Sequence, residues 1–159
     1  MENFGARCRF IGVTGRERSM KIAICDDESG FLEEVKNKIY EYANSHNWEP
    51  AVETFTSGEE LTLLNEKFDL IILDYQMEGL TGLETAERLR QGKNCLTCII
   101  FLTSYPEIAI PAYSVDTYRF VVKNTLYAGL FKALDDFRAI QRLDYDISIK
   151  SEGELVTLL

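Results

Sequence analysis

The chain has 159 residues, a formal net charge of −9 and a hydrophobic content of 46%, which is enough for one domain with a buried core, so extensive disorder is not expected. Nucleic-acid binding by this chain is not expected either, because phosphate contacts need clustered Lys and Arg, and here acidic residues outnumber basic ones by 26 to 17. The sequence contains no apolar run long enough to span a membrane and no convincing signal peptide, which favours a cytoplasmic protein without membrane contact.

The first nineteen residues differ from the rest of the chain. Residues 1–19 are rich in Gly and Arg, show no hydrophobic periodicity and precede a second methionine, Met20. We expect them to form a poorly ordered leader in front of the folded domain.

Short apolar runs alternate with amphipathic stretches from Met20 onward, which is typical of βα units around a parallel sheet. The predicted strands are 21–25, 51–55, 68–73, 96–102 and 118–122. The predicted helices are 28–46, 57–65, 81–91, 104–113 and 125–141. Capping-box patterns at Ser57 and Thr81 mark two of the helix starts. The pattern predicts an α/β fold with a doubly wound, five-stranded parallel sheet over residues 20–143.

The last sixteen residues, 144–159, change character. Residues 146–150 and 155–158 read as two short strands around a turn at 151–154. An isolated hairpin is marginal in water. We therefore expect a linker and a short C-terminal β-hairpin that begins a second, β-rich domain absent from this chain.

Four cysteines do not form the pattern of a secreted disulfide framework. The spacing of Cys95 and Cys98 is compatible with zinc or redox chemistry, but no second pair accompanies it and His46 is the only histidine. We therefore interpret these residues, together with Cys8 and Cys25, as buried or incidental thiols.

Residues with reactive or charged groups follow four of the predicted strands, where the carboxyl ends of parallel strands meet at one edge of the sheet. They are Asp26 and Asp27 after the first strand, Asp74 after the third, Thr103 and Ser104 after the fourth, and Lys123 after the fifth. Three carboxylates brought together repel one another unless a cation lies among them. The pattern predicts a Mg²⁺ site beside a reactive aspartate.

The same set of residues fits phosphoryl transfer to a carboxylate. Such a nucleophile needs a metal that bridges the oxygens, a cation that neutralises the incoming charge and a donor for the remaining oxygen. Asp74, Mg²⁺ on Asp27, Lys123 and Thr103 supply these parts. Ser104 is interpreted as a helix cap whose backbone N–H is also able to face the phosphoryl group.

This arrangement resembles the receiver domain of two-component response regulators, which has a flavodoxin-like, CheY-like fold. The resemblance implies that Asp74 accepts a phosphoryl group from a sensor histidine kinase. It also implies a Mg²⁺ ion held directly by Asp27 and Asp74, by the backbone carbonyl of Gln76, and through water by Asp26. An aromatic residue three positions before the lysine, here Phe120, would report the activated state.

A narrower resemblance concerns the stretches 101–107 and 112–116, which are similar to receivers of the LytTR class, as in AgrA-like regulators. The output domain of that class is a β-rich DNA binder. The resemblance implies a transcriptional regulator that forms homodimers on activation, with any DNA contact made by an output domain absent from this chain.

Two residues depart from the family pattern. Asn124 follows the lysine where a cis proline is usual, and a non-proline cis bond costs about 2.5–4 kcal/mol, so we expect a trans peptide and a different placement of Lys123. Glu78 replaces the usual proline four residues after the acceptor and adds a negative charge near the pocket.

Two alternatives to a phosphorylated switch stay open. A pseudo-receiver would keep the fold as a binding module without taking phosphate, and Glu78 and Asn124 favour that reading. A phosphohydrolase of the haloacid dehalogenase type would need an acid/base Asp two positions after the nucleophile, where this chain has Gln76. We therefore expect self-catalysed phosphorylation of a switch rather than an enzyme acting on a diffusible substrate.

Overall fold

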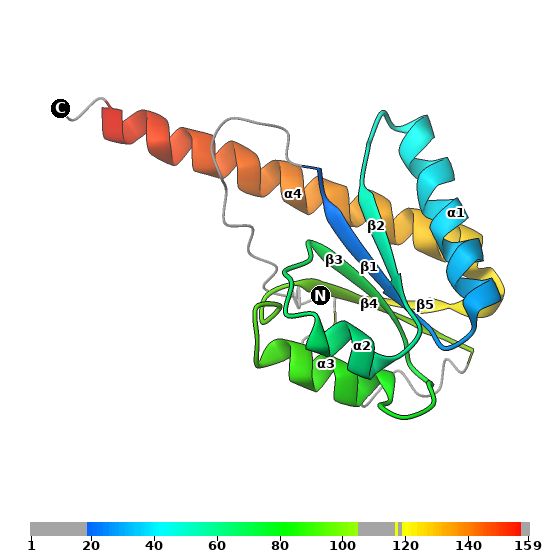
Figure 1. The fold of residues 1–159 in the computed structure, drawn as a ribbon. Coiled ribbons are helices and arrows are strands. Elements are labelled where there is room, and N and C mark those ends of the chain that lie inside the picture. Colours follow the sequence, from blue (N-terminus) through cyan, green and yellow to red (C-terminus); the bar gives the residue numbers. More distant parts are fainter. Residues whose placement is uncertain (1–18, 105–116, 118, 157–159) are drawn as a thin grey trace, which may run out of the picture.

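The structure, a computed structural model, describes residues 19–104, 117 and 119–156. Its elements in chain order are β1 (Lys21–Cys25), α1 (Ser29–Ser45), β2 (Ala51–Phe55), α2 (Gly58–Leu63), β3 (Leu70–Asp74), α3 (Gly82–Arg90), β4 (Cys98–Thr103), β5 (Arg119–Val122), the 3₁₀ turn η3 (Lys123–Thr125) and α4 (Leu126–Val156). The five strands form one parallel sheet in the order β2-β1-β3-β4-β5 (Figure 1). This confirms the predicted doubly wound α/β architecture.

Helices cover both faces of the sheet, which explains why its central strands are apolar along their whole length. Figure 1 shows α1 and α4 on one face and α2 and α3 on the other. Every residue of β3 and β4 is buried. One core lies under α1 and α4 and includes Ile39, Leu134 and Phe137. The other lies under α2 and α3 and includes Phe68 and Phe101. Burial of apolar side chains on both faces thus holds the sheet between two helical layers.

The strand boundaries differ from the predicted ones by one or two residues. Strand β3 begins at Leu70 rather than at Phe68, because the backbone N–H of Phe68 donates to the side chain of Asn94 (2.9 Å) instead of to a neighbouring strand. Strand β3 also runs one residue further, so that Asp74 is its last member. The backbone of Asp74 is therefore held by the sheet.

Of the two predicted capping boxes, one forms completely and the other in part. At Thr81 the capping box is complete: its hydroxyl accepts from the Glu84 N–H and the Glu84 carboxylate accepts from the Thr81 N–H. At Ser57 only half of the box forms. The hydroxyl of Ser57 accepts from the N–H of Glu60, but the Glu60 carboxylate accepts from Thr56.

The predicted C-terminal hairpin is wrong for the described residues. Helix α4 does not end near Gln141 but continues without a break through 144–156, so its last turns extend past the sheet (Figure 1). A helix satisfies its backbone hydrogen bonds within one segment, whereas an isolated two-stranded hairpin is marginal in water. The alternating apolar residues of 146–150, which predicted a strand, lie in a helix.

Three sequence predictions lie outside the described residues. They are the leader over 1–18, the helix over 105–113 and the end of the hairpin at 157–158. Ser19, which we assigned to the leader, is described, and its hydroxyl donates to the Glu49 carbonyl (3.0 Å).

Among the described residues, no helix combines enough length with enough apolar character to cross a bilayer.

Candidate functional site: a carboxylate pocket with one lysine

Three aspartates meet at the carboxyl edge of the sheet, between its neighbouring strands β1 and β3. Asp26 and Asp27 directly follow β1, and Asp74 ends β3. One carboxylate oxygen from each lies within 4.8 Å of the other two. Asp26 and Asp74 are buried and Asp27 is exposed. The prediction that the two strand ends bring these acids together is confirmed by this geometry.

Lys123 enters the same pocket from the end of β5. Its Nζ lies 2.7 Å from Oδ2 of Asp26 and 3.2 Å from Oδ1 of Asp74. The peptide bonds of the described residues are all trans, including the one between Lys123 and Asn124. The trans bond agrees with the sequence prediction, but it does not move the lysine away from the acids. The turn η3 places the side chain in the pocket without a proline.

Backbone N–H groups fix each carboxylate. Oδ1 of Asp26 accepts from the N–H of Glu28 (2.9 Å), the residue directly before α1. Asp27 accepts from the N–H of Glu78 through Oδ2 (2.9 Å). Both oxygens of Asp26 are thus engaged, by Glu28 and by Lys123. Asp27 presents its carboxylate to solvent, and the main chain of Glu78, rather than its side chain, contacts the acids.

The pocket shifts the pKa values of its members. Burial and the neighbouring Asp26 carboxylate raise the pKa of Asp74 to about 6, although Lys123 and the backbone N–H of Gln76 act in the opposite direction. Burial acts to lower the pKa of Lys123, but the carboxylates of Asp26 and Asp74 more than offset it, so the net shift of that pKa is upward. Asp74 is therefore mostly ionised above neutral pH and Lys123 stays charged.

The donor set fits a hard divalent cation. Three carboxylates and one ammonium leave two negative charges uncompensated when all four groups are ionised. Carboxylate oxygens are the ligands that Mg²⁺ prefers, and it commonly binds through one or two of them together with waters. Asp27 and Asp74 are placed to hold such an ion, which would offset the repulsion between the acids.

The remaining predicted site residues surround this pocket at the ends of β4 and β5. Thr103 is the last residue of β4, is buried, and pairs in register with Val122, next to Lys123. Ser104 follows it and is exposed; the helix that it would cap lies outside the described residues. Phe120 is half-buried on β5 and stacks on Phe101, with ring centroids 5.5 Å apart. Gln76 is exposed after β3, and only its N–H contact with Asp74 is seen.

Two close contacts beside Asp74 were not predicted. A Cβ atom on Gly82 would lie 2.1 Å from the carbonyl oxygen of Asp74, so only glycine fits at the start of α3. The spacing of eight residues between Asp74 and Gly82 was visible in the sequence, but the contact depends on how the loop returns. The buried thiol of Cys25 lies against Met77, with a distance of 3.6 Å between the sulfurs.

The cysteines show no arrangement for metal binding in the part of the chain that the structure describes. Cys25 and Cys95 are free thiols, so Cys95 is not joined to Cys98. Cys98 is buried at the start of β4 and is disulfide-bonded, so our interpretation of it as a thiol is wrong. Burial and the nearby Asp26 raise the pKa of the Cys25 thiol to about 12, which keeps it protonated. Within the described ranges, the three aspartates are the one group of Cys, His, Asp and Glu residues close enough together for a metal.

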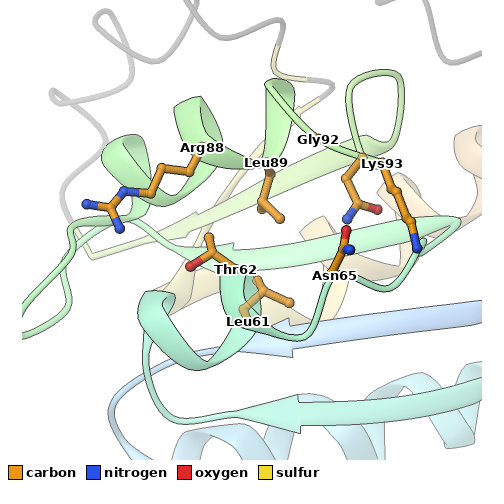
Figure 2. A pocket seen from close by; sticks show the side chains of 8 residues that line it. Leu61, Thr62, Asn65, Arg88, Leu89, Gly92 and Lys93 are labelled. Carbon is orange, nitrogen blue, oxygen red and sulfur yellow. The ribbon is translucent and has the colours of Figure 1, made fainter.

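A small pocket lies between α2 and the loop after α3, at the edge of the sheet opposite to the carboxylates. Figure 2 shows Leu61 and Thr62 on one side of it and Leu89 and Lys93 on the other. Arg88 also borders this pocket, but its guanidinium points away from the other labelled side chains (Figure 2). The pocket therefore lacks converging charged groups, and we assign no chemistry to it.

Comparison with known sequences supports the same picture. The response regulator receiver domain family matches residues 22–135. The positive alginate biosynthesis regulatory protein of Pseudomonas aeruginosa is 32% identical over 117 residues, which are 72% of this chain and 46% of that protein. The sensory transduction protein LytT of Bacillus subtilis is 26% identical over 116 residues, which are 73% of this chain and 44% of that protein. The chain thus spans about half the length of these relatives.

Solved structures agree on the fold. The response regulator TrrA of Thermotoga maritima, in complex with Mg²⁺-BeF, is 29% identical with a TM-score of 0.63, covering 74% of this chain and 98% of TrrA. The chemotaxis protein CheY4 of Vibrio cholerae is 26% identical with a TM-score of 0.64, covering 76% and 99%. The strand order, the placement of the acids and lysine at one sheet edge, and the match over 22–135 lead to one conclusion: the chain belongs to the response regulator receiver domain family.

Proposed function

We propose that this chain is a phosphorylation-dependent switch in which Asp74 accepts a phosphoryl group from a histidine kinase. The observation that carries this proposal is the position of Asp74: a buried carboxylate at the end of β3, 3.2 Å from the ammonium of Lys123 and within 4.8 Å of two further acids. An attacking carboxylate oxygen, a fixed cation and a divalent metal site are the parts that phosphoryl transfer to aspartate needs.

In the proposed reaction an ionised oxygen of Asp74 attacks the phosphorus atom of a phosphorylated donor, and the bond from phosphorus to the donor breaks. A Mg²⁺ ion held by Asp27, Asp74 and the carbonyl of Gln76 would neutralise charge on the transferred oxygens. Lys123 pairs with Asp74 before the reaction, and its ammonium is placed to pair with the new phosphoryl group. The binding of TrrA to Mg²⁺-BeF supports this assignment by analogy.

The switch itself would use Thr103 and Phe120. In the proposal the Thr103 hydroxyl and the backbone N–H of Ser104 donate to the phosphoryl oxygens, and the movement of Thr103 makes room for Phe120 to turn inward. Phe120 lies half-buried on the Phe101 ring in the present structure, so an inward turn would bury it further. A local charge would thereby shift the population between two arrangements of the face formed by β4 and β5.

The output of this switch is proposed from the relatives. Several are named sensory transduction protein LytT or LytR, and each is about twice as long as the part matched here. We propose a LytTR-type DNA-binding output, encoded outside this chain, with a homodimer on activation. A cytoplasmic location follows from the proposed kinase partner. The chain would act as a signalling switch rather than as an enzyme with a diffusible substrate.

Intact-mass measurement after incubation with acetyl phosphate and Mg²⁺ tests the acceptor. We expect a gain of one phosphoryl group in the wild type and none in Asp74→Asn, which keeps the shape of the side chain and removes the nucleophile. Omission of Mg²⁺ should reduce the gain strongly. A folded wild-type chain that gains no phosphoryl group with Mg²⁺ present would instead indicate a pseudo-receiver.

A further inference from the structure

The ammonium of Lys123 has a neighbour besides its two acids. Its Nζ lies 4.3 Å from the centre of the Phe31 ring, on the first turn of α1. A cation within about 6 Å of a ring centre is attracted by the electrons of the ring face, and the attraction grows when water is excluded. The Lys123 side chain is only 12% exposed, so this contact is largely shielded from solvent.

Both the side chain and the backbone of Phe31 are held in place. Phe31 packs against the core under α1 and α4. Its backbone N–H donates to the carbonyl of Glu28 (3.0 Å), and the N–H of Glu28 donates to Asp26 (2.9 Å). The position of the ring is therefore linked to the same carboxylate that pairs with Lys123.

We propose that Phe31 is the positioning residue for Lys123, keeping the ammonium inside the pocket while its carboxylate partners change during phosphorylation. The turn after β5 has a trans peptide at Lys123 and an exposed Asn124, so it lacks the rigidity of a proline at that point. Two sides of the ammonium face Asp26 and Asp74, and the Phe31 ring covers another. An ammonium covered in this way stays near Asp74 when the carboxylate of Asp74 becomes phosphorylated. The role of Phe31 in phosphoryl transfer rests on the proposed function, whereas the contact between Phe31 and Lys123 does not.

A set of three variants tests the proposal through the rate of phosphoryl gain from acetyl phosphate. Phe31→Leu keeps an apolar side chain and removes the ring face, and should slow the reaction by about 2- to 30-fold, the range for one cation–π contact. Phe31→Tyr keeps the ring and should stay within about twofold of the wild type. Phe131→Leu, which also removes a half-buried ring packed against the same core, is the control and should not change the rate.

Binding of Mg²⁺ separates positioning from general damage to the pocket. Because Lys123 and the metal share Asp74, a looser lysine should leave the Mg²⁺ affinity of Phe31→Leu unchanged or higher. A fall in both Mg²⁺ affinity and rate would mean that the variant distorts the acids, and equal rates for Phe31→Leu and Phe31→Tyr would mean that the ring face is irrelevant. Either result would overturn the proposal.

NMR of the wild-type chain provides a readout that needs no phosphorylation and no variant to fold. The Hε protons of Lys123, close to the ring face, should be shifted upfield, and this shift should persist in Phe31→Tyr and disappear in Phe31→Leu. Ordinary Hε shifts in the wild type would refute the contact. An upfield shift in a chain that gains no phosphoryl group would refute the proposed function while leaving the positioning of the ammonium intact.

Discussion

Asp74 is a buried carboxyl group whose pKa is raised to about 6. Asp74 is 4% exposed and lies beside Asp26, so its ionisation is opposed by burial and by a like charge. Lys123 reduces this cost without removing it. A carboxylate whose negative charge is opposed by burial and by a like charge is suited to bind a cation, because the cation relieves that electrostatic cost.

The raised pKa of Asp74 has a direct consequence for stability in the absence of metal. A carboxyl group whose pKa is higher in the folded state favours folding while it is protonated, and this contribution is lost as the pH rises through its folded pKa. We expect the free energy of unfolding of the wild type, relative to Asp74→Asn, to fall by about 1 kcal/mol between pH 5 and pH 7.5. Urea unfolding of both proteins with EDTA measures this difference, and a difference independent of pH would show that Asp74 is not perturbed.

At the scale of elements, the site depends on how closely α3 approaches the end of β3. The start of α3 is fixed by the capping box at Thr81 and by a hydrogen bond from the Gly82 N–H to the carbonyl of Tyr75 (2.9 Å). The absence of a side chain at Gly82 permits this approach. The backbone after Asp74 is therefore positioned by the helix that follows the loop, and not by β3 alone.

Gly82→Ala should disrupt this junction. Its Cβ would meet the carbonyl oxygen of Asp74 at 2.1 Å, and backbone atoms must move to relieve the clash. We expect a loss of about 2–3 kcal/mol in the free energy of unfolding, together with slower phosphoryl gain. Chemical denaturation and intact mass measure the two effects.

Gly30→Ala is the matched control for that experiment. Gly30 lies in the first turn of α1, and a Cβ there meets nothing within 4 Å. Because alanine favours helix over glycine, the variant should be as stable as the wild type or up to about 1 kcal/mol more stable. If both substitutions cost the same stability, the close approach at Gly82 is not the cause.

At the scale of the whole molecule, the parallel sheet gathers residues that are far apart in the chain. Asp26, Asp74 and Lys123 come from the ends of three strands and meet because all parallel strands point to the same edge. The opposite edge is closed by structural hydrogen bonds: Oδ1 of Asn94 accepts from the N–H of Phe68, and Nδ2 of Asn94 donates to the carbonyl of Glu66. The fold thus separates the edge that carries the aspartates and the lysine from an edge held by structural hydrogen bonds.

Binding of Mg²⁺ at the edge that carries the aspartates should stabilise the whole domain by mass action. At a Mg²⁺ concentration about 100 times the dissociation constant, we expect the free energy of unfolding to rise by about 2.7 kcal/mol. Asp27→Asn should fold normally, because the amide oxygen can still accept from the Glu78 N–H, but should lose most of this gain. Thermal unfolding with and without Mg²⁺ checks both; an equal rise in wild type and variant would place the metal elsewhere.

Local sequence patterns determined the elements, their order and the identity of the pocket residues. Buried strands such as β3 and β4 are recognisable because both of their faces are apolar, and a polar residue at a strand end stands out against that background. Capping at Thr81 is equally local. The strands predicted within 146–156 are the exception: a few alternating apolar residues are a weak strand signal, because strand preference depends on packing against neighbouring strands, and α4 continues there instead.

Tertiary structure alone decided how the pocket is held together. The pairing of Lys123 with Asp26 and Asp74, the contact of its ammonium with Phe31 and the approach of Gly82 to Asp74 join residues distant in the sequence. The raised pKa of Asp74 also depends on the fold, because both of its causes, burial and the neighbouring Asp26 carboxylate, are tertiary. Hydrophobic periodicity carries information about which face of an element is buried, but distances of a few ångströms between side chains depend on packing of the whole domain, and those distances set the electrostatics of the site.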